Sequence, residues 1–160
     1  MSTHPVAAVA AALFAQTTVA AAATVTDDPD TVVRVDLGDP GNFAEPGAIG
    51  IAIATEETEA ITGVSAQWMG SDTATYEILC AAKAWQGLDD DTGRVARMLR
   101  AFELVDVVRA RLAAVLEATR ASGVVGLALI RESYVPMIDE HDNSGALVQF
   151  AVRVVATRPQ

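Results

Sequence analysis

The sequence predicts an α+β fold, in which a largely antiparallel sheet is packed by an N-terminal helix and one long amphipathic helix. Between Asp89 and Arg120, apolar residues recur at steps of three and four, the period of one helix face. The first 23 residues form an alanine-rich run without Asp, Glu, Lys or Arg. Short runs of alternating apolar and polar residues lie between these two stretches and after the second, which indicates half-buried strands. A helix that is apolar on one side buries that side against another element, so we expect the long helix to cover the sheet.

The composition indicates one domain, residues 1–160, large enough for a substantial core. Hydrophobic residues make up 51% of the chain and aromatic residues only 5%, so the core should be mostly aliphatic. The chain has 11 basic and 21 acidic residues, and its formal net charge is −10. This balance argues against a non-specific DNA-binding protein, which needs clustered Lys and Arg to hold phosphates.

The first element is predicted to be a helix. Pro5 suits a first turn, and Val6, Val9, Leu13 and Phe14 fall on one side. The same run has the apolar character of a signal peptide with a cleavage site near residue 23. However, no Lys or Arg precedes Arg34, so the positively charged N-terminal region of a signal peptide is missing. A helix is therefore the preferred interpretation, and a signal peptide at residues 1–23 is the alternative.

Four strands are predicted before the long helix. The first two cover 33–37 and 49–53, and the second has one face of small residues, as if another segment packs closely on it. The next two cover 61–69 and 74–85, with a turn at 70–72 that indicates a hairpin. Because adjacent strands are joined by short loops, we expect the sheet to be largely antiparallel.

The long helix is predicted to be continuous from near Asp91 to Arg120. Acidic residues at its start suit the free N–H groups there, and Gly123 can close it in a left-handed conformation. Its apolar stripe includes Val95, Leu99, Val105 and Val108, with most arginines off the stripe. Two further strands, 124–135 and 148–154, follow the helix and are separated by an acidic loop.

No catalytic or cofactor motif is recognisable. The chain shows no phosphate-binding glycine loop, nucleophile elbow or paired-histidine motif. Cys80 is the single cysteine and is predicted to be a buried, inert thiol. The loop 139–143 contains oxygen donors and His141, but a solvated hairpin loop explains it better than a metal site does. The sequence therefore predicts no enzyme, no cofactor and no metal.

Taken whole, the chain resembles the tail terminator (tail completion) family of long-tailed, siphovirus-type bacteriophages. The resemblance is a pattern over nearly the full length rather than a short fingerprint. Its strongest piece is Tyr76–Gly87 followed by an Asp run and Arg94–Phe102. The other segments that support it are Pro5–Leu13, Val32–Pro40, Gly47–Ile53, Val124–Ile130 and Ala146–Val155.

The resemblance implies a structural virion protein. Such proteins form a homo-hexameric ring at the neck that caps the tail tube, ends tail polymerisation and joins the head connector. The implied partners are other copies of the chain, the tail tube protein and a head–tail connector or head-closure protein. DNA would pass through the lumen without specific binding, and no membrane is involved. Assembly would take place in the host cytoplasm, and the family implies no catalytic residues.

Residue chemistry suggests how such a ring could be held. A ring closed by rotation needs two different complementary faces on each subunit. We expect Arg94, Arg97, Arg100 and Arg109 on the long helix to contact a neighbouring subunit. We expect an acidic loop to reach the tail tube protein, and the residues concerned are Glu56, Glu57, Glu59, Asp139, Glu140 and Asp142.

Three alternatives stay open. The first is that the chain is a different phage neck or tail component, such as a head-closure or tail tube protein. The second is that it is a secreted acidic binding domain whose signal peptide is residues 1–23. The third is that it is a small enzyme without a recognisable motif. The position in the virion, the mass of the mature protein and an assay for activity would separate these readings.

Overall fold

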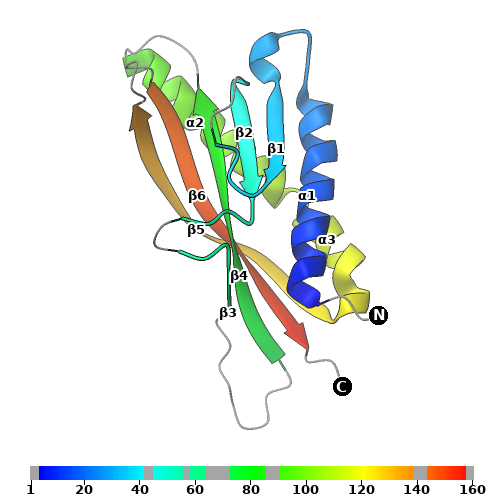
Figure 1. Ribbon diagram of the computed structural model, residues 1–160. Coiled ribbons are helices and arrows are strands. Elements are labelled where there is room, and N and C mark those ends of the chain that lie inside the picture. Colours follow the sequence, from blue (N-terminus) through cyan, green and yellow to red (C-terminus); the bar gives the residue numbers. More distant parts are fainter. Residues whose placement is uncertain are drawn as a thin grey trace.

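The chain folds into one sheet with a helical layer on one face, as shown by a computed structural model (Figure 1). The structure describes residues 4–41, 45–55, 58–63, 73–85, 91–138 and 144–157. In chain order the elements are α1 (Pro5–Thr24), the short 3-10 helix η1 (Pro29–Thr31), β1 (Val33–Leu37), β2 (Gly47–Ile51), β3 (Ile61–Gly63), β4 (Thr73–Trp85), α2 (Asp91–Arg109), α3 (Leu112–Thr119), the 3-10 helix η2 (Arg120–Ser122), β5 (Val124–Ile138) and β6 (Ser144–Thr157). The predicted α+β class is confirmed.

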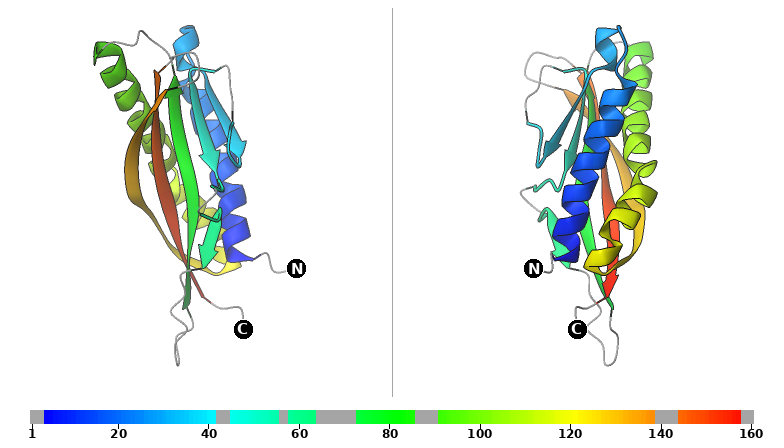
Figure 2. Two further views of the ribbon diagram at one scale, coloured as in Figure 1. Left: turned by 60° about the vertical axis from the view of Figure 1, so that its left-hand side comes forward. Right: turned by 90° about the vertical axis from the view of Figure 1, so that its right-hand side faces the viewer.

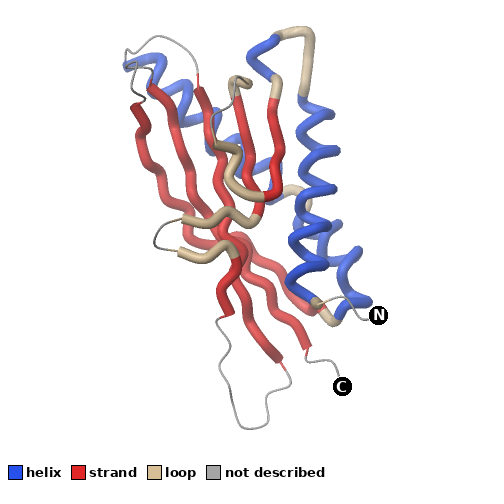
Figure 3. Tube along the Cα trace, viewed as in Figure 1, coloured by secondary structure: helices blue, strands red, loops and turns tan. Residues whose placement is uncertain are grey.

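The sheet has six strands in the order β1-β2-β4-β6-β5, with β3 also paired to β4. The long strands β4 and β6 form its centre (Figure 3), β5 of similar length pairs with β6, and the short strands β2 and β3 pair with β4. The predicted pairing of the two strands around 70–72 holds for Ile61–Gly63, which pairs antiparallel with β4. The rest of that hairpin, residues 64–72, lies outside the described residues.

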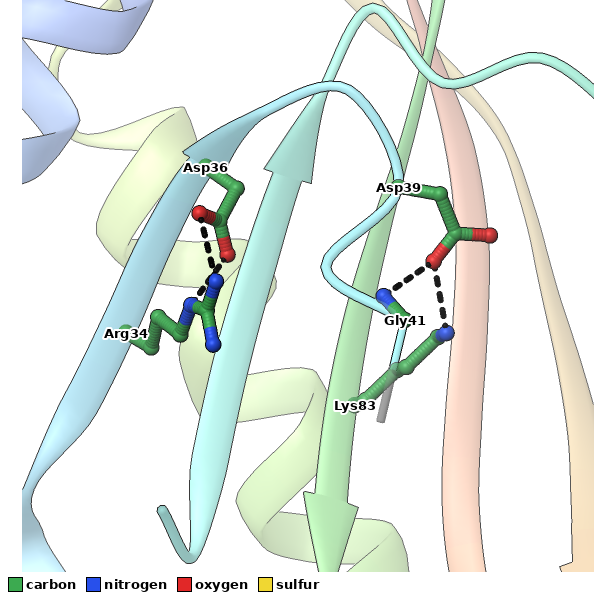
Figure 4. A network of polar contacts seen from close by, with 5 residues as sticks. All are labelled: Arg34, Asp36, Asp39, Gly41 and Lys83. Atoms are coloured by element: carbon green, nitrogen blue, oxygen red, sulfur yellow. Dashed lines mark hydrogen bonds and ion pairs between the residues drawn. The ribbon is translucent and has the colours of Figure 1, made fainter. Parts of the chain in front are cut away.

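One pair of strands is not antiparallel as expected. β1 and β2 run parallel, with Val33 opposite Gly47 and Leu37 opposite Ile51. The connection from the end of β1 must therefore run back to the end of the sheet where β2 begins. Its described part, Gly38–Gly41, lies across one face of β2 (Figure 4). A Cβ atom at Gly50 would lie 2.8 Å from the carbonyl oxygen of Gly38. The predicted close packing on the small face of this strand is thus confirmed at Gly50.

The core lies between the helices and the sheet. Figures 1 and 2 show α1, α2 and α3 gathered on the same face. Strand pairing places alternate residues of β4 and β6 on that face, and most of them are buried aliphatic, cysteine and phenylalanine side chains. The helices contribute Val9 and Leu13 from α1, and Leu104 and Val108 from α2. Removal of this apolar surface from water is the main driving force of the fold.

The predicted continuous long helix is wrong. α2 ends at Arg109, and α3 begins at Leu112. At the break, the Arg111 N–H donates to the Val108 carbonyl, a tighter bond than the α-helical pattern. The sequence from 94 to 122 has neither glycine nor proline, so the break is imposed by packing and not by a local helix breaker. Gly123 has the predicted left-handed conformation, with φ 87°.

The apolar stripe of α2 also has a different phase from the one predicted. The buried residues are Arg97, Ala101, Leu104, Val105 and Val108. Val95 and Leu99, which the sequence pattern placed on the buried side, are 50% and 55% exposed. The sheet contacts a face of the helix turned away from these two residues, and they are left on the surface.

Candidate functional site

The arginines predicted to form a subunit interface lie mostly on the surface of α2, where they pair with their own helix. Arg94 lies 3.9 Å from Asp91, and Arg100 lies 3.2 Å from Glu103. Arg109 bonds both Asp106 and Glu132, the latter on β5. Arg94, Arg100 and Arg109 each pair with a carboxylate three residues away on the same helix. Because these opposite charges cancel, the outer face of α2 is nearly neutral rather than strongly cationic. Their contact with a neighbouring subunit stays a prediction.

Arg97 is the exception among these arginines. Only 3% of the residue is exposed, and it lies on the buried face with Ala101 and Leu104. The expectation that it lies off the apolar stripe is wrong, because the stripe is rotated relative to the predicted one. Arg97 is therefore part of the interior of the fold.

The predicted acidic loops are described only in part. Glu59 is exposed and follows a turn in which the Thr55 N–H donates to the Thr58 carbonyl. Glu56, Glu57, Asp139, Glu140 and Asp142 lie outside the described residues, as does His141. Within the described ranges, no group of three His, Cys, Asp or Glu side chains could hold a metal ion.

The helix-free face of the sheet carries an ion-pair cluster that the sequence analysis missed. Glu77 on β4 is opposite Arg153 on β6, and its side chain is only 8% exposed. It accepts bonds from Arg153, at 3.4 Å, and from Arg131 of β5. Arg131 has a positive φ of 53° within the bulge that interrupts β5 between Ile130 and Ser133. The carboxylate of Glu77, beside the apolar run of residues 78–82 in β4, was the available signal in the sequence.

A second polar network lies on the same face and fastens the β1–β2 connection (Figure 4). Asp39 accepts a bond from the Gly41 N–H at 2.8 Å and pairs with Lys83 of β4 at 3.0 Å. The Gly41 hydrogen bond, aided by Lys83 and opposed by partial burial, lowers the pKa of Asp39 below its ordinary value. Nearby, Arg34 and Asp36 form an ion pair along β1 at 2.7 Å.

Cys80 lies in β4 on the helix-covered side and is fully buried, as predicted. Burial raises the pKa of its thiol to about 12, because the charged thiolate is poorly solvated there. A thiol in this state is inert near neutral pH, which removes the single cysteine as a candidate nucleophile.

Two exposed apolar surfaces are the features with the clearest capacity for binding a protein. One is on α2, where Val95 and Leu99 are one turn apart. Further along α2, Phe102 approaches Tyr134 of β5 with ring centroids 6.4 Å apart. The other surface is on α1, where Val19 is 66% exposed. Sequence reasoning missed both because periodicity shows that a helix has an apolar side but not the angle at which the sheet meets it.

Comparison of the chain with models of known protein families and with curated proteins gives no match. One helix in the described part of the chain, α1, is long and apolar enough by length and composition to cross a bilayer. In this fold its residues Val9 and Leu13 are completely buried against the sheet and the other helices. A core helix passes the same test, so the length and hydropathy of α1 carry no membrane assignment.

Proposed function

We propose that this protein is a structural subunit of a phage tail terminator, a homo-hexameric ring that caps the tail tube in the virion neck. The ring would end tail polymerisation and provide the joint to the head connector or head-closure protein. The proposal rests on the resemblance of the sequence pattern to that family. It requires no cofactor and no catalytic residue.

The observation that carries the proposal is that the segments of the resemblance all belong to one folded unit. The first forms the start of α1, and three more lie on β1, β2 and β4. The remaining segments form the first half of α2, the start of β5 and most of β6. A pattern scattered over unrelated loops would give no such support. Here the pattern coincides with the elements that build the sheet and its helical cover.

The electrostatics are consistent with a lumen that DNA passes without sticking. The chain has a net charge of −10, and the exposed arginines of α2, together with Arg120 at the start of η2, are paired with neighbouring carboxylates. A surface that is acidic on balance repels phosphate groups. This supports a role in which DNA is a passing cargo and not a bound ligand.

The geometry of β5 favours a terminator over a tail tube subunit. Tube subunits need a sheet that continues from one subunit to the next. β5 is one of the two edge strands of the sheet, with β1 at the other edge, and it contains two register shifts and Pro136, which removes a backbone donor. Bulges and proline are features that discourage pairing of an edge with another chain.

The secreted alternative requires that residues 1–23 be cleaved from the mature protein. This would remove Val6, Val9 and Leu13 from the core and expose the surfaces that they cover. Intact mass of the protein isolated from its source separates the two readings. A mature protein that starts near residue 24 would support the secreted domain, and one that retains the helix supports the proposal.

The proposal is tested by measuring mass in solution. Light scattering on the purified protein, at two salt concentrations and with or without purified tail tube protein of the same phage, should show a hexamer. The hexamer should form alone or on the tube, and tube growth should stop when it binds. A monomer that neither binds tube ends nor stops their growth would overturn the proposal.

A further inference from the structure

The outer face of α1 is unusual for a helix that faces solvent. No residue from Pro5 to Thr24 is Asp, Glu, Lys or Arg. The residues exposed along this face are small or apolar: Ala7, Ala11, Ala15, Thr18, Val19, Ala22 and Ala23. A solvated helix face normally carries charged side chains. Small residues instead form a shallow surface into which larger side chains of another helix can pack.

An acidic turn follows directly. Asp27, Asp28 and Asp30 are all exposed; the first two precede η1 and the third lies within it. The turn is held by hydrogen bonds from the Asp30 N–H to the Asp28 carboxylate and from the Thr31 hydroxyl to the Asp28 carbonyl. In the described part of the chain no basic side chain pairs with these three carboxylates. One end of α1 thus presents a negative patch beside an apolar face.

The exposed stripe of α2 has the complementary properties. Val95 and Leu99 project large apolar side chains, and Arg94 at the start of the stripe, which pairs with Asp91 of its own helix, has a side chain that is about half exposed. This stripe lies toward the β5 edge of the sheet, because Phe102 further along α2 contacts Tyr134 of β5. α1 instead packs beside β1, at the other edge of the sheet. The two surfaces therefore lie on opposite sides of the molecule.

The two surfaces also lie at the same end of the molecule. In Figure 1 the C-terminal end of α1, with η1, and the N-terminal end of α2 are both at the top. A neighbour placed beside this subunit at the same height would bring the N-terminal end of its α2, which contains Val95 and Leu99, to the C-terminal end of α1, which contains Val19. Its Arg94 would come close to the acidic turn.

We propose that the α2 stripe of one copy of this chain packs on the outer face of α1 of the next copy. Val95 and Leu99 seat among the small residues around Val19, and Arg94 faces Asp27 and Asp30. The contact joins two different surfaces, so it is heterologous, and repeated by rotation it closes a ring. Opposite charges at the end of the contact fix its orientation. This inference deepens the proposed terminator function by naming the subunit interface.

The first test uses two single variants and their mixture. Val19→Glu blocks the α1 surface, and Leu99→Glu blocks the α2 surface. Both sites are more than half exposed, so folding should be unaffected. Native mass spectrometry over a concentration series should show that the wild-type chain forms a ring and that each variant is monomeric. An equimolar mixture should form a heterodimer of twice the 16.7 kDa chain mass, since one good contact remains per pair.

The matched control is Val125→Glu on β5, which has an exposure similar to that of Leu99. This variant should form the ring like the wild-type chain. A ring that survives Val19→Glu or Leu99→Glu would overturn the inference, and so would a wild-type chain that stays monomeric at every concentration. Variants that stay monomeric when mixed would contradict a contact between the α2 stripe of one copy and the α1 face of another, which also overturns the inference.

The second test reverses charges at the end of the contact. Arg94→Glu, or Asp27→Arg with Asp30→Arg, should raise the concentration at which the ring dissociates by about tenfold or more. Combining all three substitutions in one chain should restore assembly. Arg120→Glu is the control, because Arg120 is also exposed and pairs with a carboxylate three residues away. Failure of the combined variant to recover assembly would contradict the proposed charge contact.

The same reagents separate this inference from the proposed function. Rings that depend on Val19 and Leu99 but do not stop tube growth would support the interface and overturn the terminator role. Rings that cap the tube and persist in both variants would support the terminator role and overturn the interface.

Discussion

The two faces of the central strands β4 and β6 are built on different principles. On the helix-covered face, residues such as Ile78, Cys80 and Phe150 are fully buried among apolar neighbours. On the other face the same strands place Glu77 and Arg153, which are bound to each other by charge. The strands alternate between these faces at every residue, so one backbone supports an apolar core and a polar network at once.

The difference between the two faces indicates which one stabilises the fold and which one directs the connections between strands. Burial of one large aliphatic or aromatic side chain contributes about 1.5–3 kcal/mol, whereas an exposed ion pair contributes about 0–1 kcal/mol. The helix-covered face should therefore supply most of the stability. The open face should direct connections, as Asp39 and Lys83 do for the segment after β1.

The largest effect is expected on the helix-covered face. Phe150→Ala should lower the free energy of unfolding by about 3–5 kcal/mol, because it removes a fully buried ring and leaves a cavity. Denaturant unfolding measures the loss. Val125→Ala, at an exposed position, is the control and should change stability by no more than about 0.5 kcal/mol. Equal losses in the two variants would show that this face is not the core.

The next largest effect is expected where a loop crosses the open face. At Gly50 an added Cβ would lie 2.8 Å from the Gly38 carbonyl oxygen and from Pro40 Cδ. Gly50→Ala should therefore destabilise the fold by about 1–3 kcal/mol. Gly63→Ala is a matched control, because its Cβ would lie at an ordinary 3.8 Å from the Tyr76 ring. Thermal unfolding of both variants measures the difference, and a neutral Gly50→Ala would show that the loop does not cross there.

A smaller effect is expected at the charged cluster. Glu77→Gln keeps the shape of the side chain but removes the charge that Arg131 and Arg153 bind. The loss should be about 1 kcal/mol, since both guanidinium groups stay largely hydrated. A double-mutant cycle with Arg153→Gln isolates the pair. A coupling energy near zero would contradict an energetic role for the cluster.

The smallest effect is expected at Asp39 and depends on pH. The pKa of Asp39 is lower in the folded state than its ordinary value of 3.8, so its contribution to stability is present above that value. It is lost as the pH falls through the folded pKa. Because the Asp39 side chain is half exposed, the contribution should be at most about 1 kcal/mol. Asp39→Asn should be less stable than the wild type at neutral pH and equal to it in strong acid. A difference that persists in acid would contradict the assignment.

The candidate surfaces show where sequence reasoning works and where it stops. The arginines of α2 were visible in the sequence, and Arg94 remains part of the inferred interface. The sequence did not show that Arg97 is buried or that Val95 and Leu99 are exposed. Because both sides of α2 contain apolar residues, periodicity alone does not determine which of them faces the sheet.

Local patterns were sufficient for the type and position of most elements. The alternation of β4 and β6, the helical run of α1 and the left-handed Gly123 all follow from short-range chemistry that depends on neighbouring residues. The inert state of Cys80 also follows from an apolar strand context.

Long-range packing decided the rest. The break between α2 and α3, the parallel pairing of β1 with β2 and the rotation of α2 have no local signal in the sequence. Each depends on which surface meets which, and that choice balances burial over the whole domain rather than within one segment. The sequence by itself therefore determined the elements and the class of the fold. Only the tertiary structure decided which side chains remain exposed, because exposure depends on which surfaces the packing of the whole fold leaves uncovered.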